Sequence, residues 1–300
     1  MSVIVIGSAN LDTAVSVDRH PGPGETLLAR DAVSGAGGKG LNQAVAVARS
    51  GADTWFVGAV GGDDAGRRLR DVLLDDGVRL RVGESARPTG TAFVMVADGG
   101  ENAIVVVPGA NGDESLLRRE ADAAVAELAQ GDVVLGQLEI PLPVVRSAFR
   151  GARDRGATTI LNAAPSAALP DGLLDAVDIL VVNQHECLDL AGPEFSDVEA
   201  AASVLAATVP TVVVTLGEEG ALLHSGGAVQ RVEAFPVDTV DTTAAGDTFC
   251  GALAARLAAG DDLQVAVRFA SAAAALCVQR AGASASAPTL SEIREFLAGR

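Results

Sequence analysis

Aromatic side chains are scarce in this sequence: they make up 3% of its 300 residues, with no tyrosine and one tryptophan. Few flat faces are therefore available to stack on nucleobases or sugar rings. Basic side chains are also in deficit, because 22 Lys and Arg oppose 39 Asp and Glu and leave a formal net charge of −17. The basic residues do not cluster, and a field of this sign repels polyphosphate backbones and anionic lipid headgroups. Nucleic-acid and membrane-surface partners are thereby excluded, and a ligand is expected to be held by hydrogen bonds.

Cysteines and long apolar runs are few as well. Cys187, Cys250 and Cys277 are odd in number and form no CxxC motif, which favours buried thiols in a reducing compartment over disulfides or zinc ligands. The longest uncharged stretch, 200–217, is interrupted by a proline and predicts a helix end and a buried strand rather than a membrane span. Residues 1–7 have neither the basic nor the long apolar region of a secretory signal. We therefore expect a cytoplasmic protein.

Short apolar segments rich in β-branched residues alternate with longer segments rich in Ala, Leu and Arg. This alternation predicts an α/β fold whose mainly parallel, doubly wound sheet is flanked by helices on both faces. Strands are expected at residues 3–6, 55–60, 133–138, 158–161, 179–182 and 211–216. Helices are expected at residues 41–50, 64–76, 114–129, 143–153, 198–208, 245–259, 263–280 and 291–297.

Two segments, 13–30 and 91–107, predict strands that no helix separates. The second contains Asp98-Gly99-Gly100, a signal for a hairpin turn. Together they predict a small antiparallel β lid inserted in the α/β core and formed by about residues 12–34 and 90–108. No fixed-period repeat or Pro/Ser-rich linker sets this lid apart. Residues 1–300 are therefore expected to form a single domain whose lid closes over a site.

A glycine-rich segment, Gly35-Ala36-Gly37-Gly38-Lys39-Gly40, precedes the first expected helix. It is not a P-loop, because that motif needs glycine where Val33 stands and Ser or Thr where Gly40 stands. It also lacks the βαβ context of a dinucleotide fingerprint, which argues against a nicotinamide-dependent oxidoreductase. Successive glycines let backbone N–H groups approach a polar ligand, with Lys39 and Asn42 at the helix start. An ordinary turn with a helix cap is the alternative.

The segment Asp241-Thr242-Thr243-Ala244-Ala245-Gly246-Asp247-Thr248-Phe249 directly precedes an apolar helix. Small residues at a helix start leave backbone N–H groups uncovered, and the helix dipole adds partial positive charge, so this turn suits an anion. Asp247 would repel a phosphate there, which makes chemical sense if it accepts a proton from an attacking hydroxyl. An isolated Asp at this place is also typical of a helix cap.

A third segment, Thr215-Leu216-Gly217-Glu218-Glu219-Gly220, follows an expected strand. The carboxyl edge of a parallel sheet is where nucleotides bind, so this loop is a candidate nucleotide contact, although alone it is an ordinary turn.

The ordered set of these strings resembles the ribokinase branch of the PfkB-type carbohydrate kinases over nearly the whole chain. The similarity is carried by residues 7–12 (GSANLD), 23–26 (PGET), 37–44 (GGKGLNQA), 100–102 (GEN), 106–111 (VVPGAN), 137–139 (QLE), 183–186 (NQHE), 215–217 (TLG) and 241–249 (DTTAAGDTF).

The resemblance implies transfer of the ATP γ-phosphoryl group to the 5-hydroxyl of ribose. By matching motifs, the sugar would be held by Asn10, Asp12, Gly38, Lys39, Gly40, Asn42 and Glu139. Asp247 would act as general base, and the turn formed by Ala244, Ala245, Gly246 and Asp247 would stabilise charge on the transferring group. Amides and carboxylates suit a polyol because each pairs with one or two hydroxyls.

The resemblance also implies a nucleotide site, two kinds of cation and a partner. The nucleotide would contact Asn183, Thr215, Gly217, Glu218, Gly220, Gly246 and Ser271. Glu186 would position Mg²⁺ through water, and K⁺ would lie by Asp241, Thr243, Cys277, Arg280, Gly282 and Ser286, in part through carbonyl groups. The lid would pair with the lid of a second subunit in a homodimer. Ser271 and Ala281 depart from the family pattern, by replacing a bulkier and a basic residue respectively.

Two other functions stay open at this point. A kinase on the same fold acts in some cases on another furanose or on a nucleoside, but a nucleobase commonly uses the stacking faces that this chain lacks. A non-catalytic sugar-binding regulator has no need for a base beside a phosphate turn, which the 241–247 string provides.

Overall fold

A nine-stranded sheet forms the centre of the computed structural model, which describes residues 1–99 and 101–300. Its strands lie in the order β13-β12-β11-β10-β9-β8-β1-β4-β5. The pairs from β11 to β5 are parallel, and β12 and β13 add an antiparallel edge. The strands are β1 (Ser2–Ile6), β4 (Asp53–Gly61), β5 (Arg79–Ser85), β8 (Val133–Gly136), β9 (Thr158–Asn162), β10 (Ile179–Asn183), β11 (Thr211–Thr215), β12 (Ala221–Ser225) and β13 (Ala228–Val232). The predicted doubly wound α/β fold is confirmed.

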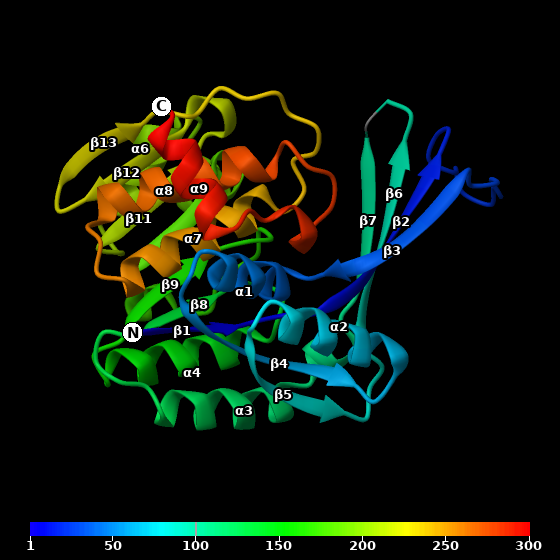
Figure 1. Cartoon of the computed structure of the whole chain (residues 1–300), viewed down its shortest axis with the longest axis horizontal. Coiled ribbons are helices and arrows are strands. Elements are labelled where there is room, and N and C mark those ends of the chain that lie inside the picture. Colours follow the sequence, from blue (N-terminus) through cyan, green and yellow to red (C-terminus); the bar gives the residue numbers. More distant parts are fainter. Residues whose placement is uncertain (100) are drawn as a thin grey trace.

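Helices cover both faces of this sheet (Figure 1). Successive residues of a strand point to opposite faces, and in β1 Val3 and Val5 enter one apolar core while Ile4 and Ile6 enter the other. The first core is completed by α1 (Lys39–Arg49), α2 (Asp64–Asp75), α7 (Ala245–Ala258), α8 (Leu263–Cys277) and α9 (Leu290–Ala298). The second is completed by α3 (Glu114–Ala126), α4 (Leu142–Arg153), α5 (Gln184–Ala191) and α6 (Val198–Leu205).

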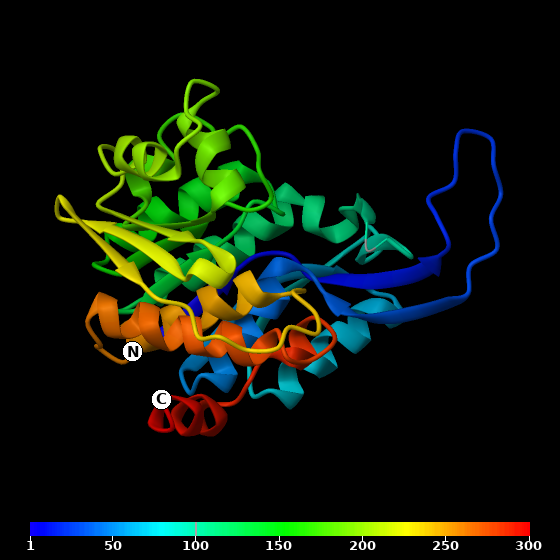
Figure 2. The same ribbon diagram turned by 90° about the horizontal axis from the view of Figure 1, so that it is seen from above.

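A second, four-stranded sheet stands away from one end of the main sheet (Figures 1 and 2). It consists of β3 (Asp31–Gly37), β2 (Asn10–Val17), β6 (Gly90–Ala97) and β7 (Asn102–Val107), in that order. The β2–β3 and β6–β7 pairs are antiparallel, and the central β2–β6 pair is parallel. β2 and β6 run the same way because each directly follows a strand of the parallel sheet, β1 and β5 respectively. We call this second sheet the lid.

The expectation of strand throughout 13–30 was wrong. β2 ends at Val17 and β3 begins at Asp31, and the residues between them form turns and irregular backbone. This segment contains Pro21 and Pro23, which have no N–H group to donate to a strand ladder. The predicted turn at 98–100 includes Gly100, which lies outside the described residues; Asp98 and Gly99 form a turn after β6.

Three strands and one helix of the described structure were not predicted from the sequence. β5 lies at the edge of the sheet and carries charged residues such as Arg79 and Arg81, so it has no continuous apolar run. β12 and β13 are joined by Gly226 and Gly227, both with positive φ. This Gly-Gly pair is the sequence signal of a hairpin turn. α5 begins immediately after β10 and is eight residues long, too short to show a clear 3.6-residue period.

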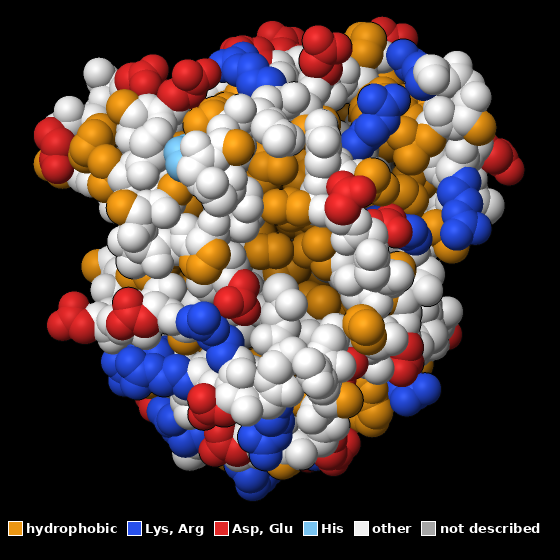
Figure 3. All heavy atoms as spheres, turned by 90° about the vertical axis from the view of Figure 1, so that its left-hand side faces the viewer, with side chains coloured by type: hydrophobic (Ala, Val, Ile, Leu, Met, Phe, Trp, Pro, Cys, Tyr) orange, Lys and Arg blue, Asp and Glu red, His pale blue; other side chains and the backbone are white. Residues whose placement is uncertain are grey.

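Charges of both signs are interleaved on the surface. Figure 3 shows Lys and Arg side chains beside Asp and Glu side chains on the face at the left of Figure 1. Within the described part of the chain, twelve of the 21 arginines form ion pairs. An arginine paired in this way contributes little net positive potential.

Among residues 1–99 and 101–300, no helix has both the length and the apolar character needed to cross a bilayer.

Candidate active site

Asp247 lies at the junction of helices α1 and α7, in the first turn of α7, and is 7% exposed. Its Oδ2 accepts a hydrogen bond from Asn42 Nδ2 at 3.0 Å, and its Oδ1 accepts one from Gln43 Nε2 at 2.9 Å. The structure thus brings together two predicted site residues that are 205 positions apart. Ala244, with no side-chain hydrogen bond, occupies the N-cap position of α7. Asp247 therefore does not cap the helix, and its carboxylate is directed toward α1.

The turn before α7 has a strained backbone. Ala244 has φ 58° and ψ 13°, and within the described residues no other non-glycine residue has positive φ. Such a conformation costs about 1 to 3 kcal/mol and persists where the surroundings enforce it, often at functional sites. The N–H groups of Gly246 and Asp247 are in the first turn of α7, so no helical carbonyl group four residues earlier accepts from them. A Cβ atom built at Gly246 would meet no atom within 4 Å outside the local helix backbone and the neighbouring residues. The turn is therefore open and suited to an anion.

Glu139 and Lys39 meet beside this turn. Glu139 Oε2 accepts hydrogen bonds from Ser8 Oγ at 2.5 Å and from the backbone N–H of Lys39 at 3.0 Å. Lys39 is the single lysine of the chain. Burial lowers the pKa of its ammonium group, but attraction by Asp247 and Glu139, with a further contribution from Glu186, outweighs burial and raises that pKa overall. Lys39 is consequently a fixed positive charge among carboxylates.

Asp12 lies on β2, and one oxygen of its carboxyl group is buried. Burial, and then repulsion by Glu139 and Asp247, raises the pKa of Asp12 from 3.8 to about 7. Its Oδ1 has no hydrogen-bond partner within the described part of the chain. A side chain at Gly37 would lie 1.9 Å from Asp12 Oδ2, so glycine is required opposite it. In its ionised form this carboxylate only accepts hydrogen bonds, so it fits a ligand that brings hydroxyl donors.

Asn10 is fixed by a residue that the sequence reading did not assign. Asn111 Nδ2 donates to Asn10 Oδ1 at 2.7 Å, and Asn111 also exchanges two hydrogen bonds with the backbone of Ala9, at 3.0 and 3.1 Å. A side chain at Gly90 would lie within 2.3 Å of both amides. Asn111 stands in the 106–111 string that carried the resemblance, and that string was the available signal for it.

The glycines at the start of α1 are required by close packing. Gly38 has φ 89°, and a side chain there would lie 2.9 Å from the backbone nitrogen of Asn10. A side chain at Gly40 would lie 2.6 Å from the backbone of Gly7 and Ser8. These glycines let the start of α1 approach the end of β1, which places Lys39 and Asn42 beside Asp247.

Five of the seven expected nucleotide residues lie at or just after the carboxyl ends of β10 and β11, whereas Gly246 lies in α7 and Ser271 in α8. Asn183 and Thr215 are register partners there, and Gly217 follows with φ 60°. Glu218 is exposed on the short 3-10 turn that begins at Gly217. Gly220 has φ 92°, and a side chain there would lie 2.1 Å from the carbonyl oxygen of Val232. The loop is thus held against β13.

Ser271 lies on α8, and its hydroxyl donates to the carbonyl group of Val267 in the same helix at 2.9 Å.

Glu186 closes a capping box at the start of α5. Its backbone N–H donates to Asn183 Oδ1 at 2.8 Å, and its Oε2 accepts from the backbone N–H of Asn183 at 2.9 Å. Burial raises the pKa of Glu186, and Lys39 acts in the opposite direction. Glu186 thus starts a helix but is not an exposed surface carboxylate, since it is 8% exposed.

The residues expected near K⁺ come from two segments, 241–243 and 277–286, which meet at Asp241 and which we call the Asp241 loop. This carboxylate accepts hydrogen bonds from the backbone N–H groups of Thr243 at 2.9 Å and Gly282 at 3.0 Å. These bonds outweigh burial and lower the pKa of Asp241. Cys277 Sγ lies 3.1 Å from Ser286 Oγ and 3.8 Å from the carbonyl oxygen of Thr243. The loop is thus tied by its own polar groups.

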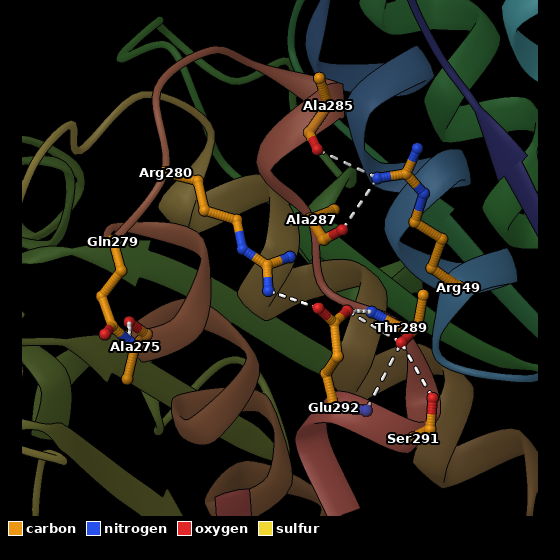
Figure 4. Close-up of polar contacts among 9 residues, drawn as sticks. All are labelled: Arg49, Ala275, Gln279, Arg280, Ala285, Ala287, Thr289, Ser291 and Glu292. Carbon is orange, nitrogen blue, oxygen red and sulfur yellow. Dashed lines mark hydrogen bonds and ion pairs between the residues drawn. The ribbon is translucent and has the colours of Figure 1, made fainter.

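Arg280 directs its guanidinium group to Glu292 on α9 (Figure 4). Arg49, at the end of α1, lies nearby and donates to the carbonyl oxygens of Ser284, Ala285 and Ala287 at 2.8 to 3.2 Å. Arg49 also forms a two-bond ion pair with Asp76. Helix α1, which carries Lys39 and Asn42, is therefore attached to the 284–287 segment.

Across the described ranges, no three His, Cys, Asp or Glu side chains converge as ligands of a metal ion.

Comparison with known proteins places this arrangement in a family. The family model described as pfkB family carbohydrate kinase matches residues 1–290. The ribokinase of Staphylococcus aureus (strain COL) is 38% identical over 305 residues, covering 98% of each chain. The ribokinase structure from Thermotoga maritima superposes with a TM-score of 0.89 at 34% identity, covering 99% of both chains. The Arabidopsis thaliana ribokinase complexed with ribose and ATP superposes with a TM-score of 0.87 at 34% identity, covering 99% of this chain and 98% of that one. The chain belongs to the pfkB family of carbohydrate kinases.

Proposed function

We propose that the chain transfers the γ-phosphoryl group of ATP to the 5-hydroxyl of D-ribose and releases ribose 5-phosphate and ADP. The observation that carries this proposal is the buried Asp247 carboxylate beside the strained, open turn at Ala244. Asp247 takes the proton of the hydroxyl, the new O–P bond forms at the γ-phosphorus, and the bond to the bridging β–γ oxygen breaks to leave ADP. The whole-length similarity to ribokinases, one of them complexed with ribose and ATP, supports ribose as the acceptor.

The sugar is held by polar groups around Lys39. Asp12 and Glu139 accept hydrogen bonds from sugar hydroxyl groups, and Asn42 Oδ1 accepts another. Within the described residues, Asp12 Oδ1 and Asn42 Oδ1 are buried and have no protein partner. Asn10 and the backbone at Gly38 and Gly40 complete this set. Groups that would stay unpaired beside a wrong sugar make binding selective.

The phosphates lie at the turn that leads into α7. The N–H groups of Gly246 and Asp247 and the dipole of α7 stabilise negative charge on the transferring group. The nucleotide extends over Asn183, Thr215, Gly217, Glu218 and Gly220 toward Ser271.

Two cations fit the residues present. Mg²⁺ keeps most of its water, and Glu186 is a buried carboxylate close enough to Lys39 to share its field, so it suits a water-mediated contact with a phosphate-bound Mg²⁺. K⁺ suits the Asp241 loop, which also includes Thr243, Cys277, Arg280, Gly282 and Ser286. Since the Arg280 side chain is engaged by Glu292, this residue offers its carbonyl group rather than its charge. When bound, each cation neutralises phosphate charge.

The whole chain, 1–300, is proposed to act as a single kinase domain in a homodimer joined through the lids. Apolar side chains of β7 and its neighbour β6 support this contact, because Phe93, Ile104, Val105, Val106 and Val107 are 45 to 59% exposed. A closed lid excludes water, which would otherwise compete as acceptor. The three cysteines are buried free thiols, as is usual for a protein of a reducing compartment such as the cytoplasm. Burial raises the pKa of Cys187 to about 11, so this thiol stays protonated.

Coupled measurement of ADP release tests the proposed function. The acceptors are ribose, 2-deoxyribose, other pentoses, fructose and nucleosides, each with ATP and Mg²⁺ and with K⁺ or Na⁺. We expect the highest kcat/KM with ribose and a higher rate in K⁺ than in Na⁺. Turnover of a nucleoside without turnover of ribose would replace this function by nucleoside phosphorylation, and sugar binding without any turnover would favour a regulator.

A further inference from the structure

Behind Asp247 lies a chain of buried amide side chains that the proposed reaction does not use. Gln43 on α1 is fully buried. One side of its Nε2 donates to Asp247 Oδ1 at 2.9 Å, and the other donates to Asn162 Oδ1 at 3.0 Å. Its Oε1 accepts from Gln137 Nε2 at 2.7 Å. Both Gln43 N–H groups and its carbonyl group are thus engaged, and Gln137 is also fully buried.

The direction of this chain follows from the charge of Asp247. An ionised carboxylate only accepts hydrogen bonds, so Gln43 must turn its NH₂ group toward Asp247. The Gln43 carbonyl group then faces Gln137, which must donate in turn. The Gln137 carbonyl oxygen is consequently left toward Gly7, where it has no partner within the described part of the chain and where a side chain would lie 2.0 Å away.

An unpaired buried carbonyl group is costly, and reversal of the Gln137 amide would not remove the cost. Reversal would place the Gln137 oxygen against Gln43 Oε1. A second reversal at Gln43 would then place that oxygen against the Asp247 carboxylate, which is worse because a charge is involved. The unpaired carbonyl group is therefore that of Gln137, beside Gly7 and away from the reacting atoms. The arrangement favours one orientation of the Asp247 carboxylate.

We propose that Gln43 is a positioning residue for the base, and that its side-chain amide, oriented by Gln137 and Asn162, holds the Asp247 carboxylate in one orientation. This inference deepens the proposed function and rests on it. Asn42 binds the second Asp247 oxygen but also faces the sugar, whereas Gln43 is fully buried and acts only through Asp247.

Replacement of Gln43 by Met or Glu tests this role. Gln43→Met keeps the length of the side chain and removes both donors, and Gln43→Glu places a second acid against Asp247. We expect kcat to fall by about 10- to 100-fold in Gln43→Met, the range of one hydrogen bond to a charged group, while the KM for the sugar stays near that of the wild type. The acid limb of the pH profile of kcat moves to higher pH in both variants, and further in Gln43→Glu.

The matched control is Thr159→Val, at the opposite end of the strand that carries Asn162. Thr159 is fully buried, and its hydroxyl group donates to the carbonyl oxygen of Ala176 at 2.7 Å. Loss of this hydroxyl group lowers the free energy of unfolding and leaves the contacts of Asp247 unchanged. An unchanged acid limb in both Gln43 variants, or an equal shift in Thr159→Val, overturns the inference. Crystal structures of the wild type and Gln43→Met supply a readout without turnover, and an unmoved Asp247 carboxylate overturns it as well. Lack of ribose turnover in the wild type refutes the proposed function instead.

Discussion

Replacement of Asp12 by Asn is expected to make the sugar-free chain more stable while it weakens sugar binding. The carboxylate lies near Glu139 and Asp247, and burial together with these like charges raises the pKa of Asp12 from 3.8 to about 7. In the unfolded chain the group ionises at its ordinary pKa, so folding favours its protonated form. Asn is close in size and carries no charge, so the substitution removes the repulsion without opening a cavity.

The sign and size follow from this raised pKa. Between pH 4 and 7 the folded chain binds the proton that the unfolded chain has released, so the Asp12 carboxyl group costs progressively more stability as pH rises and the cost levels off above pH 7. A shift from 3.8 to about 7 sets a ceiling of about 4 kcal/mol. Water and side-chain relaxation around a partly exposed group reduce it to about 1 to 2 kcal/mol. For a chain of this length that corresponds to about 2 to 3 °C in Tm.

Differential scanning calorimetry of the wild type and Asp12→Asn without sugar, at pH 5, 6, 7 and 8, measures this effect. We expect the Tm difference to favour Asp12→Asn, to grow from pH 5 to 7 and to stay constant at pH 8. Asp113→Asn is the control of opposite sign, because hydrogen bonds from Ser85 and the N–H of Leu116 lower the pKa of Asp113 and stabilise the fold above its ordinary pKa. A lower Tm for Asp12→Asn at pH 8, or a difference independent of pH, would refute the reasoning.

Three further outcomes are expected. Asp247→Asn lowers kcat by about 100-fold or more in the ADP-release assay and keeps most sugar affinity, and wild-type turnover would remove Asp247 from the base role. Lys39→Arg lowers kcat/KM at least tenfold although it keeps the charge, because a planar guanidinium does not replace a compact ammonium among carboxylates; equal kcat/KM would show that charge alone matters. Arg49→Met lowers the free energy of unfolding by about 2 to 3 kcal/mol in urea denaturation, because it removes the ion pair with Asp76 and the hydrogen bonds to the carbonyl oxygens of Ala285 and Ala287. The more exposed Arg280→Met is its control, with a loss of about 1 kcal/mol or less, and equal losses would contradict this ranking.

The central strands could be predicted because burial on both faces makes them continuous apolar runs, as in β10 with Ile179 to Val182. β5 could not, because the edge position lets Arg79 and Arg81 interrupt the apolar pattern. The parallel pairing of β2 with β6 depends on where β1 and β5 end in space, which no local pattern encodes. Most helices were predictable from the longer segments rich in Ala, Leu and Arg between the strands, but α8 ends at Cys277, three residues earlier than expected.

At the site, residues with a chemical motif were predictable and residues that only orient them were not. Asp247 and Lys39 stand in glycine-rich strings whose backbone requirements are visible in sequence. Gln43 lies on α1, Gln137 directly follows β8 and Asn162 ends β9, so their contact depends on the packing of α1 against the ends of β8 and β9. Nothing in their spacing marks them, although Gln43 and Gln137 both stand within strings that carried the resemblance.

Lys39 is the one lysine in a chain whose formal net charge is −17, so it is an important local source of positive potential in the site. Three carboxylates, Glu139, Glu186 and Asp247, act on one ammonium group, and Asp12 lies near two of them, so the site carries excess negative charge in a negative molecule. An incoming nucleotide is also an anion, and it binds only where local donors outweigh this field: the N–H groups before α7, the ammonium of Lys39 and the cations that arrive with the phosphates. Surface carboxylates beyond about 8 Å are screened at physiological salt and matter little there. The repulsion stored around Asp12 is relieved when sugar hydroxyls donate to it, so sugar binding should raise the Tm of the wild type more than that of Asp12→Asn. Equal stabilisation of the two by saturating ribose would place Asp12 outside the sugar site.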